Sequence, residues 1–440
     1  MRQFDGQDLS TCAVLAVVAS ISIIPAIAYV LMRFDCVISL MLLTPWVHWA
    51  LGQEALQEAT PTPTTGSYLR VALVCALGAV SYFYALRLRR ANAQDIPWPL
   101  SLLLIFIAFA GFSVTYSLDP FYTTVRTFEF LCFWGFLWAL FIWLRTGGRS
   151  RDVLVYFFWI AAVGVSINAL SLCLLPSVVW SPIMANRFQG LTGHPNTLGT
   201  LCMIFYPIAF WRMQSSRPGQ KVLSAGLIGI ALILHVLSGS RATLGCALCG
   251  FALWQIKRRR MLGALVIGLL ILAIVATLVI GSSIPKSFQR ESGGGLTDLT
   301  GRPEFWKAAW IMFKERPFHG YGYEVAGRIW EDPRFFRPGY RLWSGSARTS
   351  LHDGYLSVTL GLGIPGLLIW LAILFSPFRF LRLILARPEG LVCVVIMTEL
   401  LVLNFVEDAI STSRGLGSLV FWVFWLVAQV LGRAFPDEQA

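Results

Sequence analysis

Long apolar stretches alternate with short polar ones along almost the whole chain. A membrane-spanning helix needs roughly 20 mostly apolar residues. By that measure the pattern predicts thirteen spans, of which 36–51 is the weakest because it is short and contains Pro45 and His48. If that stretch re-enters the membrane or merges with a neighbour, twelve spans remain. The predicted spans are 12–32, 36–51, 71–86, 98–115, 124–144, 153–175, 196–211, 222–238, 242–256, 261–282, 355–376, 390–406 and 415–432.

The composition agrees with this pattern. Hydrophobic residues make up 56% of the 440 residues and charged residues 13%, whereas soluble domains carry about 25% charged residues. The fold class is therefore an all-α polytopic membrane protein with 12–13 transmembrane helices. The first apolar run, 12–32, is long enough to span and lacks a small-residue cleavage site, so we interpret it as a helix and not as a signal peptide.

The spans divide the chain into three predicted parts. Residues 1–282 form an N-terminal transmembrane helix bundle, 283–354 one large loop with short amphipathic helices, and 355–440 the C-terminal transmembrane helices. Within the loop, apolar and aromatic residues recur at helical spacing from Glu304 to Glu315. We expect that helix to lie on the membrane surface.

Basic clusters predict the orientation of the chain in the membrane. They follow every second span from the third onward, and cytoplasmic loops are enriched in Lys and Arg. This places the C-terminus and the clusters inside and the 283–354 loop outside, while the side of the N-terminus depends on whether 36–51 crosses. The net charge of +12 thus suits a membrane and not a nucleic acid. The clusters are 87–90, 145–151, 212–221, 257–260 and 379–387.

The cysteines give no metal or redox signal. Nearly all nine lie inside apolar runs, and the only C-x-x-C spacing, Cys246 with Cys249, lies in an apolar helix without a partnering His. Small buried side chains explain them better than ligands do. We find no other metal motif, nucleophile elbow or phosphate loop, so no metal or cofactor is expected.

Polar groups at membrane depth are costly and usually mark function or a partner. Several arginines lie on the predicted outer side, at span ends or in the loops between them: Arg126, Arg187, Arg241 and Arg302. A guanidinium binds phosphate with two parallel hydrogen bonds. An isolated arginine at a span end is more often a side chain that reaches to the interface, but a group of them on one side favours an anionic ligand.

Two short stretches add candidate groups to these arginines. In "NRFQGLTGHPNTLG", His194 and Asn196 follow Arg187, and Asn196 either caps the next helix or contacts a ligand. His194 suits a cap, a core partner or a ligand. In "SLHDGYLSV", His352 stands at the start of an apolar run, followed by Asp353 and Tyr355.

His352 is the sharpest candidate for catalysis. Its alternative is a polar tip at the membrane interface, whereas a histidine can also take a proton from a hydroxyl near neutral pH. Asp353 is adjacent in sequence, which argues against a direct side-chain pair. The following "GLGIPG" predicts a thin or kinked helix beneath the site.

Four segments resemble the O-antigen ligase and polymerase superfamily. They are "FSVTYSLDPFYTTVR", "NRFQGLTGHPNTLG", "LSGSRATLG", and "LTGRPEFWKAAW…RPFHGYGYE" followed by "HDGYLSVTLGLGIPG". Their order and their shared outer placement carry the resemblance, which covers about 110–410.

The resemblance implies a GT-C-type membrane glycosyltransferase of the bacterial inner membrane, with its active site facing the periplasm. The donor would be an undecaprenyl-diphosphate-linked glycan and the acceptor a glycan or lipid A–core, with inversion and without a metal. By motif match, Arg187, Arg241 and His352 would be catalytic. Arg302, Arg126, His194, Asn196, Asp353 and Tyr355 are candidates for substrate binding.

Two alternatives remain open at this point. A polymerase joins repeat units and works with a chain-length regulator as a candidate partner, whereas a ligase moves the finished chain onto lipid A–core. The "GYGYEVAGRIW" stretch favours the polymerase. A transporter of lipid-linked glycans would instead place its cations along a path through the midplane, and here they gather at outer ends.

Overall fold

The computed structural model describes residues 34–51, 65–92, 96–181, 187–215, 217–257, 302–326, 351–411 and 415–433. Helices dominate these ranges, which confirms the predicted all-α fold. The two strands described, β1 (Trp180–Ser181) and β2 (Arg187–Phe188), form one antiparallel pair with Trp180 opposite Phe188. The helices are α2 (Phe34–Leu51), α3 (Thr65–Asn92), α4 (Trp98–Phe112), η2 (Ser113–Tyr116), α5 (Pro120–Thr146), α6 (Ser150–Leu174), α7 (Pro176–Val179), η3 (Gly190–Thr192), α8 (Pro195–Ser215), α9 (Pro218–Ser238), α10 (Arg241–Lys257), α12 (Arg302–Glu315), α13 (Gly354–Phe375), η7 (Ser376–Phe380), α14 (Leu381–Ile384), α15 (Pro388–Leu403) and α16 (Leu416–Gly432).

Helices occupy eleven of the thirteen predicted spans, and the other two, 12–32 and 261–282, lie outside the described residues. Among the described helices, six are long and apolar enough to cross a membrane, which confirms a polytopic membrane protein. The total of 12–13 spans and the GT-C-type fold stay predictions. The six are Leu69–Leu88, Trp98–Tyr116, Pro120–Thr146, Ser150–Leu174, Pro218–Ser238 and Gly354–Ile384.

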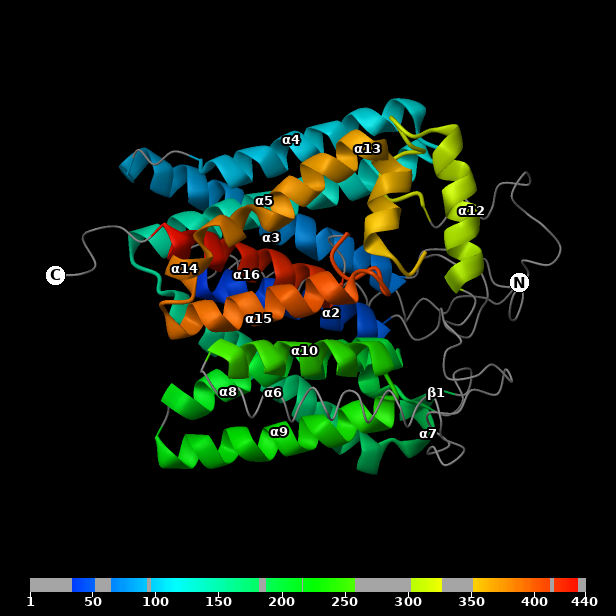
Figure 1. Ribbon diagram of the computed structural model, residues 1–440. Helices are drawn as coiled ribbons and strands as arrows, with labels where there is room; N and C mark the ends of the chain where they lie inside the picture. Colours follow the sequence, from blue (N-terminus) through cyan, green and yellow to red (C-terminus); the bar gives the residue numbers. More distant parts are fainter. Residues whose placement is uncertain are drawn as a thin grey trace, which may run out of the picture.

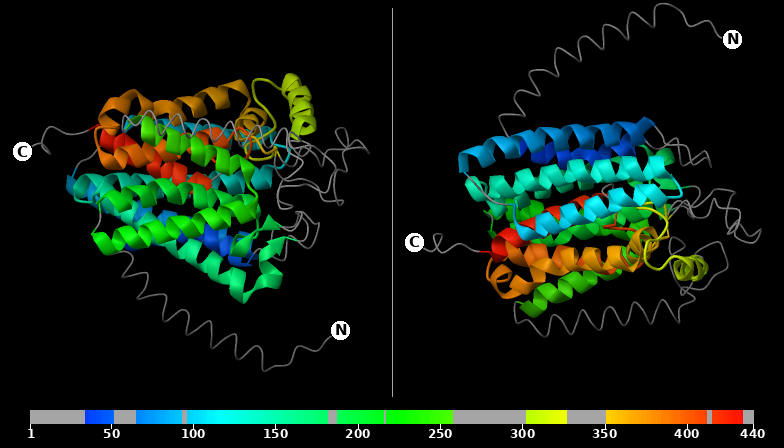
Figure 2. Two further views of the ribbon diagram at one scale, coloured as in Figure 1. Left: turned by 60° about the horizontal axis from the view of Figure 1, so that its bottom comes forward. Right: turned by 90° about the horizontal axis from the view of Figure 1, so that it is seen from above.

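The long helices lie side by side in one bundle, as the views in Figures 1 and 2 agree. Helix α16 is at its centre, and every residue from Leu416 to Gln429 is buried. A helix that is apolar on all sides must be surrounded by others, and α16 packs against α5, α15 and α14. Helix α13 packs against α4, and α15 packs against α10. The last part of the chain thus completes the bundle. The three-part division of the chain stays a prediction.

The two ends of the bundle differ in character. The described parts of the five basic clusters, at the ends of α3, α5, α8 and α10 and in η7 and α14, lie at the end drawn on the left in Figure 1, which we call the basic end. Helix α12, predicted at 304–315 and found at Arg302–Glu315, crosses the opposite end, which we call the site end. The alternation of the clusters along the chain is therefore consistent with the predicted crossing pattern.

Helix α13 is broken near its middle, as the "GLGIPG" stretch predicts. Gly363 has φ +67°, which an L side chain rarely adopts, and Pro365 follows. The backbone groups released by the break need partners in an apolar setting. They find them in the segment after α12, because Ile364 N donates to Pro317 O at 2.8 Å and Leu360 O accepts from Tyr321 N at 2.9 Å.

Close contact between α3 and α5 depends on Gly78. A methyl group there would clash with the backbone carbonyl of Cys132, which cannot move independently of its helix. We expect Gly78→Ala to lower the free energy of unfolding by about 1–3 kcal/mol, measured by thermal unfolding in detergent. Gly229→Ala in α9 is the matched control because nothing lies within 4 Å of its added methyl. Equal stability of both variants would contradict the packing described here.

Candidate functional site

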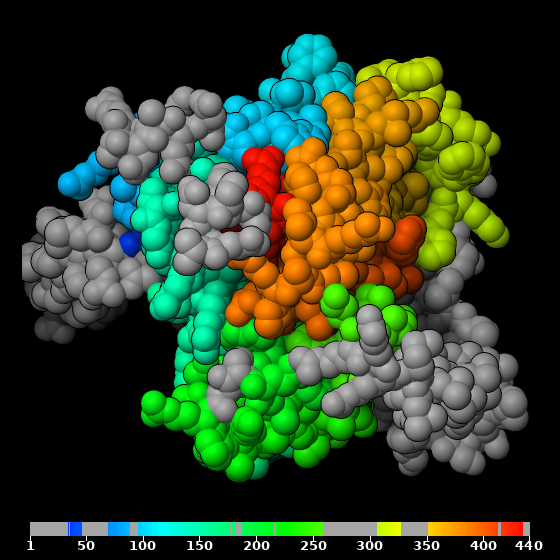
Figure 3. Space-filling view, turned by 60° about the vertical axis from the view of Figure 1, so that its left-hand side comes forward, coloured from blue at the N-terminus to red at the C-terminus, as the bar shows by residue number. Residues whose placement is uncertain are grey.

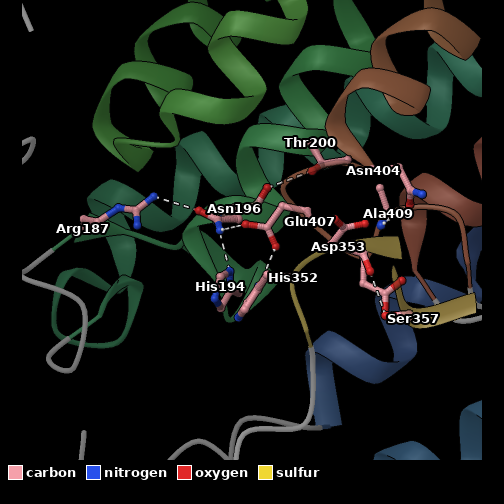
Figure 4. A network of polar contacts seen from close by, with 11 residues as sticks. Arg187, His194, Asn196, Thr200, His352, Asp353, Ser357, Asn404, Glu407 and Ala409 are labelled. Carbon is pink, nitrogen blue, oxygen red and sulfur yellow. Dashed lines mark hydrogen bonds and ion pairs between the residues drawn. The ribbon is translucent and has the colours of Figure 1, made fainter. Parts of the chain in front are cut away.

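Four segments that are far apart in sequence meet at the site end. They are the segment from β2 to the start of α8, the start of α13 and the loop after α15 (Figure 4), together with the turn between α9 and α10. Each brings polar side chains to the same place. The residues that sequence analysis drew from two separate motifs, "NRFQGLTGHPNTLG" and "SLHDGYLSV", thus become neighbours.

The carboxylate of Glu407 joins these motifs. Its Oε1 accepts a hydrogen bond from Asn196 Nδ2 at 2.7 Å, and its Oε2 lies 3.1 Å from Nδ1 of His352. The side chains of His352 and Glu407 are 31% and 18% exposed, so the pair is reachable from outside yet partly shielded. A carboxylate at Nδ1 favours the tautomer with the proton on that atom, which leaves the lone pair on Nε2.

Arg187 extends the network by one more residue. Its Nη2 donates to Asn196 Oδ1 at 3.0 Å, so the amide of Asn196 lies between a cation and an anion. The alternative that Asn196 caps α8 is wrong, because its side chain makes these two contacts instead. His194 stands before α8 and takes the capping position, with Nδ1 accepting from Asn196 N at 3.1 Å.

Arg187 also contacts the turn that carries Arg241. Its Nε donates to Ser238 O at 2.7 Å, three residues before Arg241 begins α10. The turn is possible because Gly239 has φ +59°. The two arginines predicted to hold an anion are therefore positioned by connected backbone.

Buried polar side chains hold the turn between α9 and α10 in place. His235 Nε2 lies 2.8 Å from Thr243 Oγ1, which ties the last turn of α9 to the first turn of α10. A methyl group on Gly199 would clash with Ser240 and Thr243, so α8 lies directly against the turn. The position of Arg241 is therefore fixed by packing from α8 and by hydrogen bonds.

The backbone at His352 is unusual. Its φ is +52°, in the left-handed region where residues other than glycine are uncommon. Asp353 then begins α13, its Oδ1 accepting from Leu356 N at 3.0 Å. As expected, Asp353 does not pair with His352 but caps the helix. Burial raises the pKa of the Asp353 carboxyl, while hydrogen bonds from the backbone of Leu356 and Tyr355 oppose the rise.

The loop that bears Glu407 is held by buried Asn404. Its Oδ1 accepts from Ala409 N at 3.1 Å and Ile410 N at 3.0 Å, and its backbone carbonyl accepts from Gly354 N at 2.9 Å. The last bond links the Glu407 loop to the start of α13. The distance between Glu407 and His352 is therefore set by the backbone as well as by their own contact.

Two of the other predicted substrate-binding residues, Arg126 and Tyr355, have structural partners. Arg126 pairs with buried Glu129 at 2.7 Å, and Arg70 reaches the same carboxylate at 2.9 Å. Tyr355 donates to Leu401 O at 3.0 Å. Arg302 begins α12, and its side chain lies outside what the structure describes. The roles assigned to Arg126, Tyr355 and Arg302 stay predictions.

Sequence analysis did not assign a role to Glu407 or Asn404. The signal was present in "LNFVEDAISTSRG", a polar stretch that interrupts apolar helices at the predicted outer side. The same cost of polar groups at membrane depth that singled out the arginines applies to it. The sequence could not predict the contact between Glu407 and His352, because the two residues are 55 positions apart.

Within the described residues, no group of three or more His, Cys, Asp or Glu side chains is placed so that it could hold a metal ion. The expectation that transfer needs no metal stays a prediction. Its direct check is activity after chelation.

Comparison with known proteins bears on the family. Residues 225–371 match the family model described as O-antigen ligase. This match supports the O-antigen ligase/polymerase superfamily for the chain. The matched O-antigen ligase region contains Arg241 and His352, while Arg187, Asn196 and Glu407 lie outside it. No curated protein matches the chain. The match supports glycosyl transfer of the ligase or polymerase kind in general.

The contact between Asn196 and Glu407 can be measured by a double-mutant cycle on unfolding free energy in detergent. We expect Asn196→Ala and Glu407→Ala together to cost about 0.5–3 kcal/mol less than the sum of the single changes, because each variant already breaks the shared bond. Asn196→Ala combined with Arg149→Ala, an exposed residue at the basic end, should be additive within about 0.5 kcal/mol. Additivity in both pairs would contradict the network.

Proposed function

We propose that this protein transfers a glycan from a lipid diphosphate carrier to a sugar hydroxyl at the periplasmic face of the bacterial inner membrane, and that it joins repeat units into a polymer. The observation that supports this most is the 3.1 Å contact between His352 and Glu407, connected through Asn196 to Arg187. A proton acceptor and an anion-binding cation are thereby held in one network at the site end.

The first requirement of the reaction is a stronger nucleophile. The acceptor hydroxyl loses its proton to Nε2 of His352 as its oxygen attacks C1 of the donor sugar. Glu407 stabilises the imidazolium that forms, because its carboxylate lies at Nδ1. A bond forms between the acceptor oxygen and C1 while the bond from C1 to the diphosphate oxygen breaks, which inverts the configuration at C1.

The second requirement is a stabilised leaving group. Negative charge grows on the diphosphate oxygen as its bond to C1 breaks, and fixed cations lower the energy of that state more than that of the bound donor. Arg187 and Arg241 are proposed to hold the diphosphate. One such contact is typically worth about 3–4 kcal/mol, or roughly 100–1,000-fold in rate. The lipid tail stays in the membrane and the acceptor approaches from the periplasm.

A ligase remains the second candidate. The description of the matching family as O-antigen ligase favours it, whereas the "GYGYEVAGRIW" stretch favours a polymerase. In the structure Gly320 and Gly322, which have φ +66° and +110°, place the described part of this stretch, 320–326, against the break in α13. The chemistry at His352 is the same in both cases, and only the acceptor differs.

The test is the length of lipid-linked glycans extracted from a deletion strain and from strains that carry variants. For a polymerase we expect single repeat units to accumulate and long polymer to disappear, with recovery by the wild-type gene. His352→Ala, Glu407→Ala and Arg241→Ala should fail to restore polymer at equal protein levels. Arg241→Lys should also lose most activity, because lysine keeps the charge without the two-pronged hydrogen bonding.

Arg149→Ala is the control and should restore polymer, since its partner Asp152 lies with it at the basic end. Long chains that accumulate on the lipid carrier in the deletion strain would assign the protein as a ligase. Normal polymer from His352→Ala and Arg241→Ala would refute the site.

A further inference from the structure

Two guanidinium groups from distant segments lie together at the basic end. Arg379 lies in η7, and Arg433 directly follows α16. Burial lowers the pKa of Arg433, and the charges of Arg379 and of Arg145, on the last turn of α5, lower it further. We call Arg379 and Arg433 the arginine cluster.

Aromatic rings hold the arginine cluster in place. The guanidinium carbon of Arg379 lies 4.4 Å from the ring centroids of both Trp98 and Phe380. A methyl group on Gly432 would lie 2.5 Å from Phe380 Cβ, so the end of α16 lies directly against this residue. Arg379 and Arg433 are therefore neighbours across Phe380. Trp98 is 42% exposed, as expected of a tryptophan at a membrane interface.

Basic residues are expected in cytoplasmic loops from topology alone. The arginine cluster is therefore compared with another arginine at the same end. Arg149 belongs to the same end, is 77% exposed and pairs with Asp152 at 3.2 Å. Its charge is neutralised by the protein itself. In the described part of the chain, Arg379 and Arg433 make no such ion pair. Gathering cations costs free energy unless an anion lies among them.

We propose that the arginine cluster binds the headgroup of an anionic phospholipid in the membrane leaflet at the basic end. Guanidinium groups match the oxygen pairs of a phosphate, and basic sites between transmembrane helices on this side suit lipids such as cardiolipin. The site joins the end of α16 to η7, where α13 ends. Figure 3 turns this end of the molecule toward the viewer, and the red atoms of the α16 segment lie there beside orange atoms from the last part of the chain.

This site is separate from the proposed transferase site and does not rest on it. His352 is at the other end of α13, which is a helix of 22 residues. At 1.5 Å per residue the two sites are about 30 Å apart along the bundle. The arginine cluster therefore belongs to the opposite leaflet from the glycan carrier.

Native mass spectrometry of the purified full-length protein tests the proposal directly. The protein is equilibrated with equal amounts of cardiolipin, phosphatidylglycerol and phosphatidylethanolamine, and the lipids it retains are counted. We expect preferential retention of the anionic lipids. Arg379→Ala and Arg433→Ala should each weaken that retention about fivefold, and both together about 25-fold, since one surface arginine is worth about 1 kcal/mol toward an anionic headgroup.

Arg149→Ala is the matched control and should change retention less than twofold. If Arg379→Ala fails to fold, Arg379→Lys is the variant to test, because it keeps the charge. We expect it to lose lipid retention to an intermediate degree. Equal retention of phosphatidylethanolamine, or the same loss in Arg149→Ala as in Arg379→Ala, would overturn the proposal.

Displacement of the lipid by excess inorganic phosphate would show a site for free phosphate instead. Lipid preference seen only after Asp437→Asn with Glu438→Gln would mean that the chain's own carboxylates occupy the cluster, which also overturns the proposal.

Discussion

A single carboxylate connects the parts of the candidate site. Glu407 accepts from Asn196 through one oxygen and contacts His352 through the other, at 2.7 Å and 3.1 Å. Removing it would leave an amide, an imidazole and, through Asn196, a guanidinium without their shared anion. Unpaired polar groups that are partly buried cost free energy, so the start of α8, the loop after α15 and the start of α13 depend on this contact together.

The need to satisfy backbone groups shapes the rest of the site end. A break in a helix within an apolar bundle requires new hydrogen-bond partners, and α13 obtains them from the segment around Tyr321. That requirement positions the segment that follows α12 against the bundle. It also explains why glycines stand at 320, 322 and 363, where φ is positive.

The fold was largely predictable from sequence, because apolar stretches of spanning length are a strong signal and the helices follow them closely. The predicted helix at 304–315 and the broken helix at 361–366 are both present. Pairwise contacts were less accessible. The arginines and His352 were identified as candidates by their cost at membrane depth, but Glu407 received no role because its partners lie 211 and 55 residues away. For the same reason the sequence left Asn196 open between a helix cap and a ligand contact and did not predict its bond to Glu407.

The most direct measurement of the central claim is transfer by purified protein in lipid nanodiscs, with a labelled lipid-diphosphate-linked glycan as both donor and acceptor. The account predicts longer glycans and released lipid diphosphate from the wild-type protein. It predicts a rate lower by about 100-fold or more in His352→Ala, since general base catalysis by a side chain contributes about 10²–10⁴-fold. Glu407→Gln should be slower than wild type but faster than His352→Ala, and folded protein must be verified for each. Wild-type rates from folded His352→Ala protein would contradict the account.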